Sequence, residues 1–286
     1  MRLKKLLYRL IPTPLKQTAM FLKDRIELYT VPSRSCKFDL LCSSHEFSLA
    51  EIFACKLIEE NWHLAKSRID ALGISNEAGG VNLGDRRALF YLVKYLRPTS
   101  ILEIGTHIGA STVSMASALE VEDRAKDAKS ARLVTVDIID VNDAVKQPWR
   151  QFGTPHSPQQ LLESLGCDER VEFVTLPSLQ YLSRTENNFD LIFLDGDHGA
   201  ATVYREVPAA LAKLRPGGVI VLHDYFPHGQ PLWRNGAVVP GPWLALDRLQ
   251  REGNPFQVCP LGTLPWPTKL DSNVSSLAVL LKRVSP

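Results

Sequence analysis

The 286-residue sequence has no apolar run approaching the roughly 18 residues that a membrane-spanning helix needs. Its five cysteines are odd in number and none has C-x-x-C spacing, which argues against a disulfide framework or a zinc site. The formal net charge of only +2 gives no overall field that would favour nucleic acid. We therefore expect a globular protein of a reducing compartment, the cytoplasm, with no nucleic-acid partner.

The N-terminal segment is strongly basic. Residues 1–25 hold seven basic residues and a single acid, Asp24. Four leucines between positions 3 and 10 fall on one helical face, while Arg9, Pro12 and Pro14 make the segment a poor signal peptide. Two interpretations stay open. The segment is either an amphipathic helix that rests on an anionic membrane, or a helix docked on its own domain or on a second subunit of a homo-oligomer.

Residues 48–98 predict two helices before the first strand. The spacing of Ser48 and Glu51 is that of a capping box, and it opens a helix that runs to about Leu72. Asp85 is placed to cap a second helix, which Pro98 ends.

From residue 99 onwards, short apolar strands alternate with helices, which is the pattern of a parallel sheet covered on both faces. The predicted fold class is α/β, a doubly wound Rossmann-like sheet. We place a domain boundary near residue 80, between an N-terminal helical extension (1–80) and the main domain (81–286). The predicted strands are 100–104, 133–139, 171–175, 189–194, 219–222, 256–261 and 276–282.

The first strand leads into a glycine turn from Glu103 to Gly109, with the sequence E-I-G-T-H-I-G. Gly105 and Gly109 let the backbone turn tightly and a ligand approach, and the N–H groups of the next helix attract an anion. A dinucleotide site would need three glycines, and Glu103 would repel a pyrophosphate. A ligand with an ammonium, a carboxylate and a ribose suits the turn better, with the ribose at Asp137. S-adenosylmethionine has these groups.

Three buried strands end in acids, Asp137, Asp195 and Asp224, and a doubly wound sheet brings such ends to one edge. Asp195 and Asp224 fall on adjoining strand ends in the usual strand order. Two close carboxylates favour a shared cation, and oxygen ligands favour Mg²⁺, so we predict a metal site there. His198 and His223 flank these acids, and each is a candidate general base. The candidate catalytic residues are therefore His198, His223 and Asp195.

These motifs together resemble the class I S-adenosylmethionine-dependent methyltransferases. They look most like the O-methyltransferase branch with catechol-type, macrocin-type and cephalosporin-hydroxylase-like enzymes. The resemblance covers about residues 85–286 and rests on the turn 103–109, on Asp137 and on the segments 189–198 and 214–224. It implies a seven-stranded sheet whose last strand is antiparallel.

The resemblance also implies roles for individual residues. The glycine turn would lie against the methionine and ribose, Asp137 would bind the ribose hydroxyls, and the segment around Ser178 would approach the adenine. Asp195 and Asp224 match metal positions of the metal-dependent members, although His223 and Tyr225 stand where those members place a further oxygen ligand. The implied cofactor-binding residues are Glu103, Gly105, Thr106, Gly109, Asp137, Ser178 and Asp195.

The reaction implied is transfer of a methyl group from S-adenosylmethionine to a hydroxyl of a small molecule or sugar, with Mg²⁺ as a candidate assistant. Two alternatives stay open: a nucleotide-dependent oxidoreductase on a related fold, and a non-catalytic methyltransferase-like module that binds a partner or membrane through its N-terminal arm. The Pro- and Gly-rich segment 226–242 is either a substrate-covering lid or a surface loop.

Overall fold

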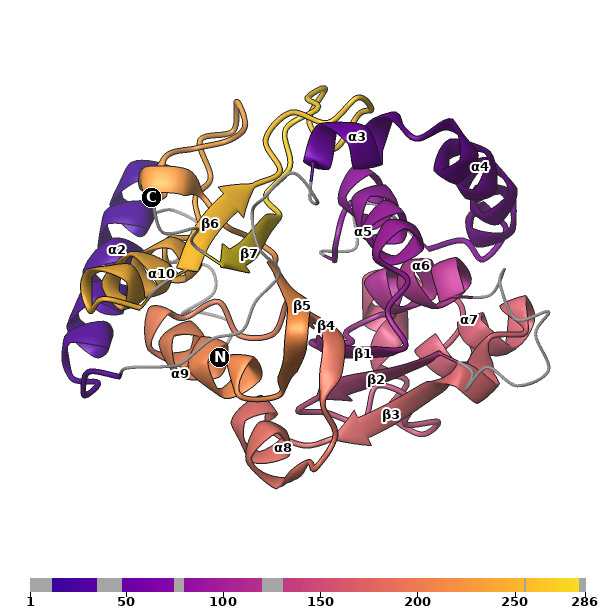
Figure 1. The fold of residues 1–286 in the computed structure, drawn as a ribbon, viewed down its shortest axis with the longest axis horizontal. Coiled ribbons are helices and arrows are strands. Elements are labelled where there is room, and N and C mark those ends of the chain that lie inside the picture. Colours follow the sequence, from indigo (N-terminus) through magenta and orange to yellow (C-terminus); the bar gives the residue numbers. More distant parts are fainter. Residues whose placement is uncertain (1–11, 35–47, 75–79, 120–130, 255, 283–286) are drawn as a thin grey trace.

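The computed structural model describes residues 12–34, 48–74, 80–119, 131–254 and 256–282. A seven-stranded sheet with the order β3-β2-β1-β4-β5-β7-β6 runs through the molecule (Figure 1). Strands β1 to β5 pair in parallel, whereas β7 is antiparallel to both β5 and β6. This confirms the predicted fold and the antiparallel last strand. The strands are β1 (Ser100–Ile104), β2 (Arg132–Asp137), β3 (Val171–Thr175), β4 (Phe189–Leu194), β5 (Leu214–Leu222), β6 (Phe256–Pro260) and β7 (Ala278–Lys282).

Helices cover both faces of this sheet (Figure 1). Successive residues of β4 show why, because Leu191 and Phe193 enter one apolar layer while Ile192 and Leu194 enter the other. On the first side lie α3 (Leu49–Ala54), α4 (Lys56–Asp70), α5 (Leu83–Leu96), α6 (Ala110–Leu119) and α7 (Pro158–Leu165). On the second side lie α2 (Thr13–Tyr29), α8 (Ser178–Arg184), α9 (Ala200–Leu211) and α10 (Gly241–Arg251).

The helix predicted from Ser48 to Leu72 is instead two helices. Cys55 has an extended backbone (φ −70°, ψ 108°), so that α3 ends before it and α4 begins after it. The Ser48 side chain still caps α3 by accepting a hydrogen bond from the Glu51 N–H at 3.4 Å. A capping pattern marks where a helix begins, but it gives no signal for a break one and a half turns later.

Helix α4 belongs to the main core although it lies in the predicted extension. Its buried side chains Ile58, Trp62 and Ile69 join the apolar layer on the first face of the sheet. The ring of Trp62 meets that of Phe90 in α5 edge to face, with 5.2 Å between centroids. The boundary near residue 80 stays a prediction.

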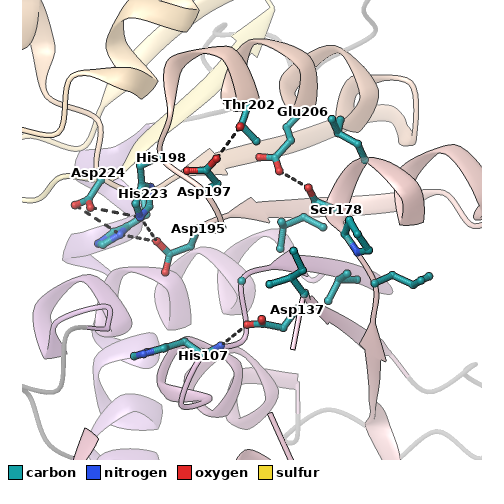
Figure 2. A pocket seen from close by; sticks show the side chains of 18 of the residues that line it. His107, Asp137, Ser178, Asp195, Asp197, His198, Thr202, Glu206, His223 and Asp224 are labelled. Carbon is teal, nitrogen blue, oxygen red and sulfur yellow. Dashed lines mark hydrogen bonds and ion pairs between the residues drawn. The ribbon is translucent and has the colours of Figure 1, made fainter. Parts of the chain in front are cut away.

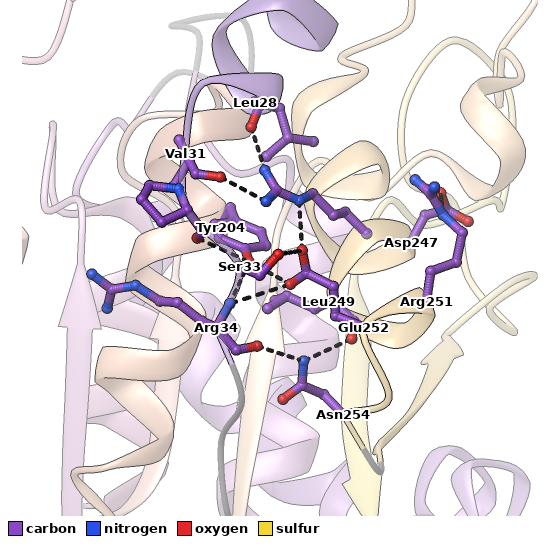
Figure 3. A network of polar contacts seen from close by, with 12 residues as sticks. Leu28, Val31, Ser33, Arg34, Tyr204, Asp247, Leu249, Arg251, Glu252 and Asn254 are labelled. Atoms are coloured by element: carbon purple, nitrogen blue, oxygen red, sulfur yellow. Dashed lines mark hydrogen bonds and ion pairs between the residues drawn. The ribbon is translucent and has the colours of Figure 1, made fainter.

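Helix α2 is docked on the same domain, against α9 and α10. The prediction for residues 1–25 falls partly outside the described residues, which begin at 12. Figure 3 shows the polar network that holds the end of α2. The Arg248 guanidinium donates hydrogen bonds to the carbonyls of Leu28 and Val31, and its Nε donates to Glu252 at 2.8 Å. The Tyr204 hydroxyl donates to the same carboxylate.

None of the helices within the described ranges is both long enough and apolar enough to cross a bilayer.

Replacing Trp62 by alanine should destabilise the whole fold, because the large buried ring leaves a cavity between α4 and α5. We expect a loss of about 3–5 kcal/mol in the free energy of unfolding, measured by urea denaturation in one cooperative transition. Leu64→Ala on the same helix, at a side chain that is 74% exposed, is the control and should change stability by at most about 0.5 kcal/mol. A separate early transition in the Trp62 variant would instead make residues 1–80 an independent unit.

Candidate active site

A cavity of about 610 Å³ opens at the carboxyl ends of β1, β2, β4 and β5. The strand order reverses between β1 and β4, which is where doubly wound sheets bind ligands. Figure 2 shows its polar groups in three places. A histidine and aspartate cluster lies at one end, the pair of Ser178 and Glu206 lies at the other, and Asp137 lies between them.

Gly105, together with Ile104 and His107 of the glycine turn, lines the cavity. Its φ of +99° is in the region that glycine tolerates, and a Cβ atom there would lie 2.2 Å from the carbonyl oxygen of Asp195. Gly109 also has a positive φ, but its backbone packs against Pro158 rather than into the cavity. The two predicted glycines therefore allow different close contacts, Gly105 with the backbone at the end of β4 and Gly109 with Pro158 of α7.

Glu103 is fully buried beneath the turn and does not line the cavity. Its carboxylate accepts hydrogen bonds from the hydroxyls of Ser111 and Thr112 at 2.5 Å and of Thr135 at 2.6 Å. Burial raises the pKa of Glu103 to about 7, although these three hydrogen bonds act in the opposite direction. The chain's own hydroxyls thus satisfy this acid, and the implied role of Glu103 in cofactor binding stays a prediction.

Thr106 is likewise buried, with its hydroxyl 2.6 Å from that of Thr135, and it too lies outside the cavity lining. Its side chain therefore supports the turn, and its implied role against the cofactor stays a prediction.

Asp137 lines the cavity at the end of β2, as predicted. One carboxylate oxygen accepts a hydrogen bond from the backbone N–H of His107 at 2.9 Å, and the other accepts from the N–H of Ile139 at 3.1 Å. These bonds fix the carboxylate across the turn, while each oxygen keeps a further lone pair for a ligand hydroxyl.

The far end of the cavity holds a buried acid that the sequence analysis missed. Glu206 of α9 accepts a hydrogen bond from the hydroxyl of Ser178, the predicted adenine-side residue, and both line the cavity. Burial raises the pKa of Glu206 to about 7. A signal was present in the sequence, since Glu206 falls on the apolar face of its helix with Val203 and Ala210.

At the opposite end, His223 is surrounded by carboxylates (Figure 2). Its Nδ1 lies 2.7 Å from Oδ1 of Asp195 and 3.7 Å from Oδ1 of Asp224, and its Nε2 lies 3.7 Å from Oδ2 of Asp85. Burial lowers the pKa of His223, but the charges of Asp195 and Asp224 outweigh burial and raise it well above its ordinary value. The pKa of Asp224 is lowered, because His223 and His198 overcome the effect of its own burial.

The sequence analysis assigned Asp85 as the cap of the second helix, and this prediction is wrong. Asn82, not Asp85, caps α5, and the Asn82 side chain donates to Oδ2 of Asp85 at 2.7 Å. Asp85 is fully buried and faces His223. Because Asp85 is far in sequence from the strand ends, no sequence pattern indicated that it contacts His223.

His198 is the more open of the two histidines. About a third of its side chain is exposed, and its Nε2 lies 3.6 Å from Oδ2 of Asp224 and 3.9 Å from Oδ1 of Asp195. Asp197 instead accepts hydrogen bonds from neighbouring groups at the start of α9, the hydroxyl of Thr202 and the N–H of Gly199. His198 is therefore the imidazole best placed to meet a ligand.

The donor set at Asp195 and Asp224 does not fit the oxygen shell that Mg²⁺ prefers. The His223 imidazole lies against both carboxylates. Tyr225, where a further oxygen ligand was sought, packs in the apolar layer instead. Within the ranges described above, no group of three or more histidine, cysteine, aspartate or glutamate side chains is arranged to hold a metal ion. The predicted Mg²⁺ site stays a prediction that the donor set does not support.

The raised pKa of Glu206 makes stability depend on pH. Between pH 4.5 and about 7, Glu206 is protonated in the folded state but ionised in the unfolded state. The free energy of unfolding therefore falls as the pH rises through this window. Because the pKa of Glu103 is raised to about 7 as well, Glu206→Gln should remove only the Glu206 part of this loss, worth up to about 3 kcal/mol, from urea denaturation curves recorded across the window. The exposed Glu163→Gln is the control and should keep the native slope. An unchanged slope in Glu206→Gln would refute the assignment.

Comparison with known proteins agrees with this geometry. A family model described as a methyltransferase domain matches residues 102–225, which hold β1, β2, β4, β5 and the strand-end acids. A catechol O-methyltransferase from Niastella koreensis is 27% identical over 176 residues. That match covers 60% of this chain and 66% of the relative, just under two thirds of its length.

Solved structures share the fold. An O-methyltransferase from Bacillus cereus in complex with S-adenosylhomocysteine matches with a TM-score of 0.50 and 21% identity, covering 80% of this chain and 91% of that one. The O-methyltransferase TomG from Streptomyces achromogenes, in complex with S-adenosylmethionine, matches with a TM-score of 0.50 and 20% identity, covering 79% and 90%. Residues 102–225 thus match a methyltransferase domain, and the chain is similar in sequence to a catechol O-methyltransferase.

Proposed function

We propose that the chain binds S-adenosylmethionine in this cavity and transfers its methyl group to a hydroxyl of a small molecule or sugar. The observation that carries the proposal is the position of Asp137. Its carboxylate lines the same cavity as the pair of Ser178 and Glu206 and as the histidine and aspartate cluster (Figure 2).

The residues present fit the cofactor from one end of the cavity to the other. Leu176 and Leu179 offer apolar contact to the adenine, and the Glu206 carboxyl provides polar recognition of its edge. Asp137 accepts hydrogen bonds from the ribose hydroxyls. Gly105, which has no side chain, lets the turn pass close to the backbone of Asp195, and the methionine part would lie along this turn. When bound, S-adenosylmethionine supplies a methyl group activated by the positive sulfonium.

The acceptor hydroxyl would lie at the cluster end, where His198 Nε2 is open to the cavity. We assign His198 as the general base that takes the hydroxyl proton, with Asp224 stabilising the resulting imidazolium. His223 does not face the acceptor in this assignment. Because its ring is hydrogen-bonded to Asp195, it holds that carboxylate in place and balances its charge. The rest of the rate enhancement would come from holding donor and acceptor in line.

The name of the Niastella relative supports catechol as the first acceptor to test. The free phenolic hydroxyl is a weak acid, which suits deprotonation by an imidazole at neutral pH.

Calorimetric titration with S-adenosylhomocysteine tests the cofactor site. Asp137→Ala should weaken binding by about tenfold or more, because the ribose hydroxyls lose a charged acceptor. Asp271→Ala, at a side chain that is 82% exposed, is the matched control and should bind as the native protein does. Equal affinity of the Asp137 variant and the native protein would overturn the ribose assignment, and binding of NAD instead would favour an oxidoreductase.

A turnover assay with catechol distinguishes a reaction that uses His198 as the base from one that depends on a metal ion. His198→Gln should lower kcat by at least about 100-fold while leaving the affinity for S-adenosylhomocysteine unchanged. Excess EDTA should leave the native rate unchanged, and Mg²⁺ should give no binding heat in calorimetry. Loss of the rate in EDTA with recovery in Mg²⁺ would restore the metal site at Asp195 and Asp224.

A further inference from the structure

Helix α2 exposes a row of apolar side chains to solvent. Leu15, Leu22, Ile26 and Tyr29 follow the spacing i, i+7, i+11, i+14, which places them on one face of the helix. They are 60%, 59%, 58% and 90% exposed. We call these four residues the α2 outer face. A docked helix would ordinarily bury its apolar residues, so this face is unexplained by the packing of α2 on its own domain.

Basic residues accompany the α2 outer face. Lys23 and Arg25 are exposed beside it, and Lys23 lies 3.7 Å from the carboxylate of Glu27, the one exposed acid of α2. The one acid of residues 1–25, Asp24, points the other way and is buried, where it accepts a hydrogen bond from the N–H of Ala200 at 3.5 Å. Residues 1–11 add four basic side chains and no acid to the same end of the chain. Together these features give an amphipathic helix with an apolar face and a basic surround.

We propose that α2 docks on an anionic lipid surface, with the α2 outer face in the headgroup region and the basic side chains on the lipid phosphates. The apolar side chains would then be removed from water, and the positive charges would lie against negative lipid phosphates. A second copy of this chain is a poorer occupant of the face. A symmetric contact would set this basic helix against its own image, and like charges would repel across it.

The inner side of α2 links this surface to the cavity. Phe21 packs against the apolar cluster of Phe226, Trp233 and Val238, and the Gln17 side chain donates to the carbonyl of Gly236. The contact of Asp24 with Ala200 lies two residues after His198. Docking would therefore hold the loop 226–240 and the start of α9 close to the lipid. If the proposed function holds, this favours an acceptor hydroxyl on a membrane-bound or amphiphilic molecule.

Vesicle flotation of the full chain tests the docking without any enzymatic readout. The native protein should float with phosphatidylcholine vesicles containing phosphatidylglycerol at low salt, and not with pure phosphatidylcholine. Leu22→Glu/Ile26→Glu should lower the bound fraction by about tenfold or more. The matched control is Leu57→Glu/Leu64→Glu, since these leucines are 64% and 74% exposed on α4 and should leave flotation unchanged.

Thermal unfolding and S-adenosylhomocysteine binding show that each variant is folded, so a failure to float is distinct from a failure of the cofactor site. Three results would overturn the proposal: no flotation of the native protein, equal flotation of the Leu22/Ile26 variant, or a native dimer in light scattering that the same variant converts to a monomer.

Discussion

A carboxylate removed from water has to find its hydrogen bonds inside the protein, and this requirement at Glu103 shapes the binding edge of the sheet. Its three hydroxyl donors come from α6 and β2, so the bonds tie the tip of β1 to both neighbours. The turn between β1 and α6 is thereby fixed. Its fixed backbone brings the N–H of His107 to Asp137 and lets Gly105 pass the carbonyl of Asp195. The ligand cavity is the space that this arrangement leaves.

The sequence predicted the sheet and the acids at its edge, because apolar strands alternating with helices have few possible arrangements and parallel strands end at one edge. Asp137, Asp195 and Asp224 accordingly line the cavity. The hydroxyl environment of Glu103 was not predicted, since an acid at a strand end looks the same in sequence whether it faces a ligand or buried hydroxyls. Only the packing of α6 and β2 on β1 decides between these two environments.

Glu206 and Asp85 could not be found in the same way, because both reach the cavity region from helices. The position of a helical side chain depends on how its helix packs, and that is a tertiary property without a local motif. The break at Cys55 has the same origin, as the chain bends there so that α3 and α4 can each pack against α5. The sequence analysis therefore predicted the residues at the strand ends well, but it did not predict which helical side chains reach the cavity region.

The place of β7 in the sheet bears on how the chain assembles. Strand β7 is the last strand in the sequence, yet it lies between β5 and β6. Until residues 278–282 have been synthesised, β5 has no partner on that side and β6 has none at all. An open strand edge invites pairing with other chains. During synthesis the half of the sheet from β3 to β5 can form first, whereas completion of its far edge must wait for nearly the whole described chain, so this edge is the part most exposed to misassembly.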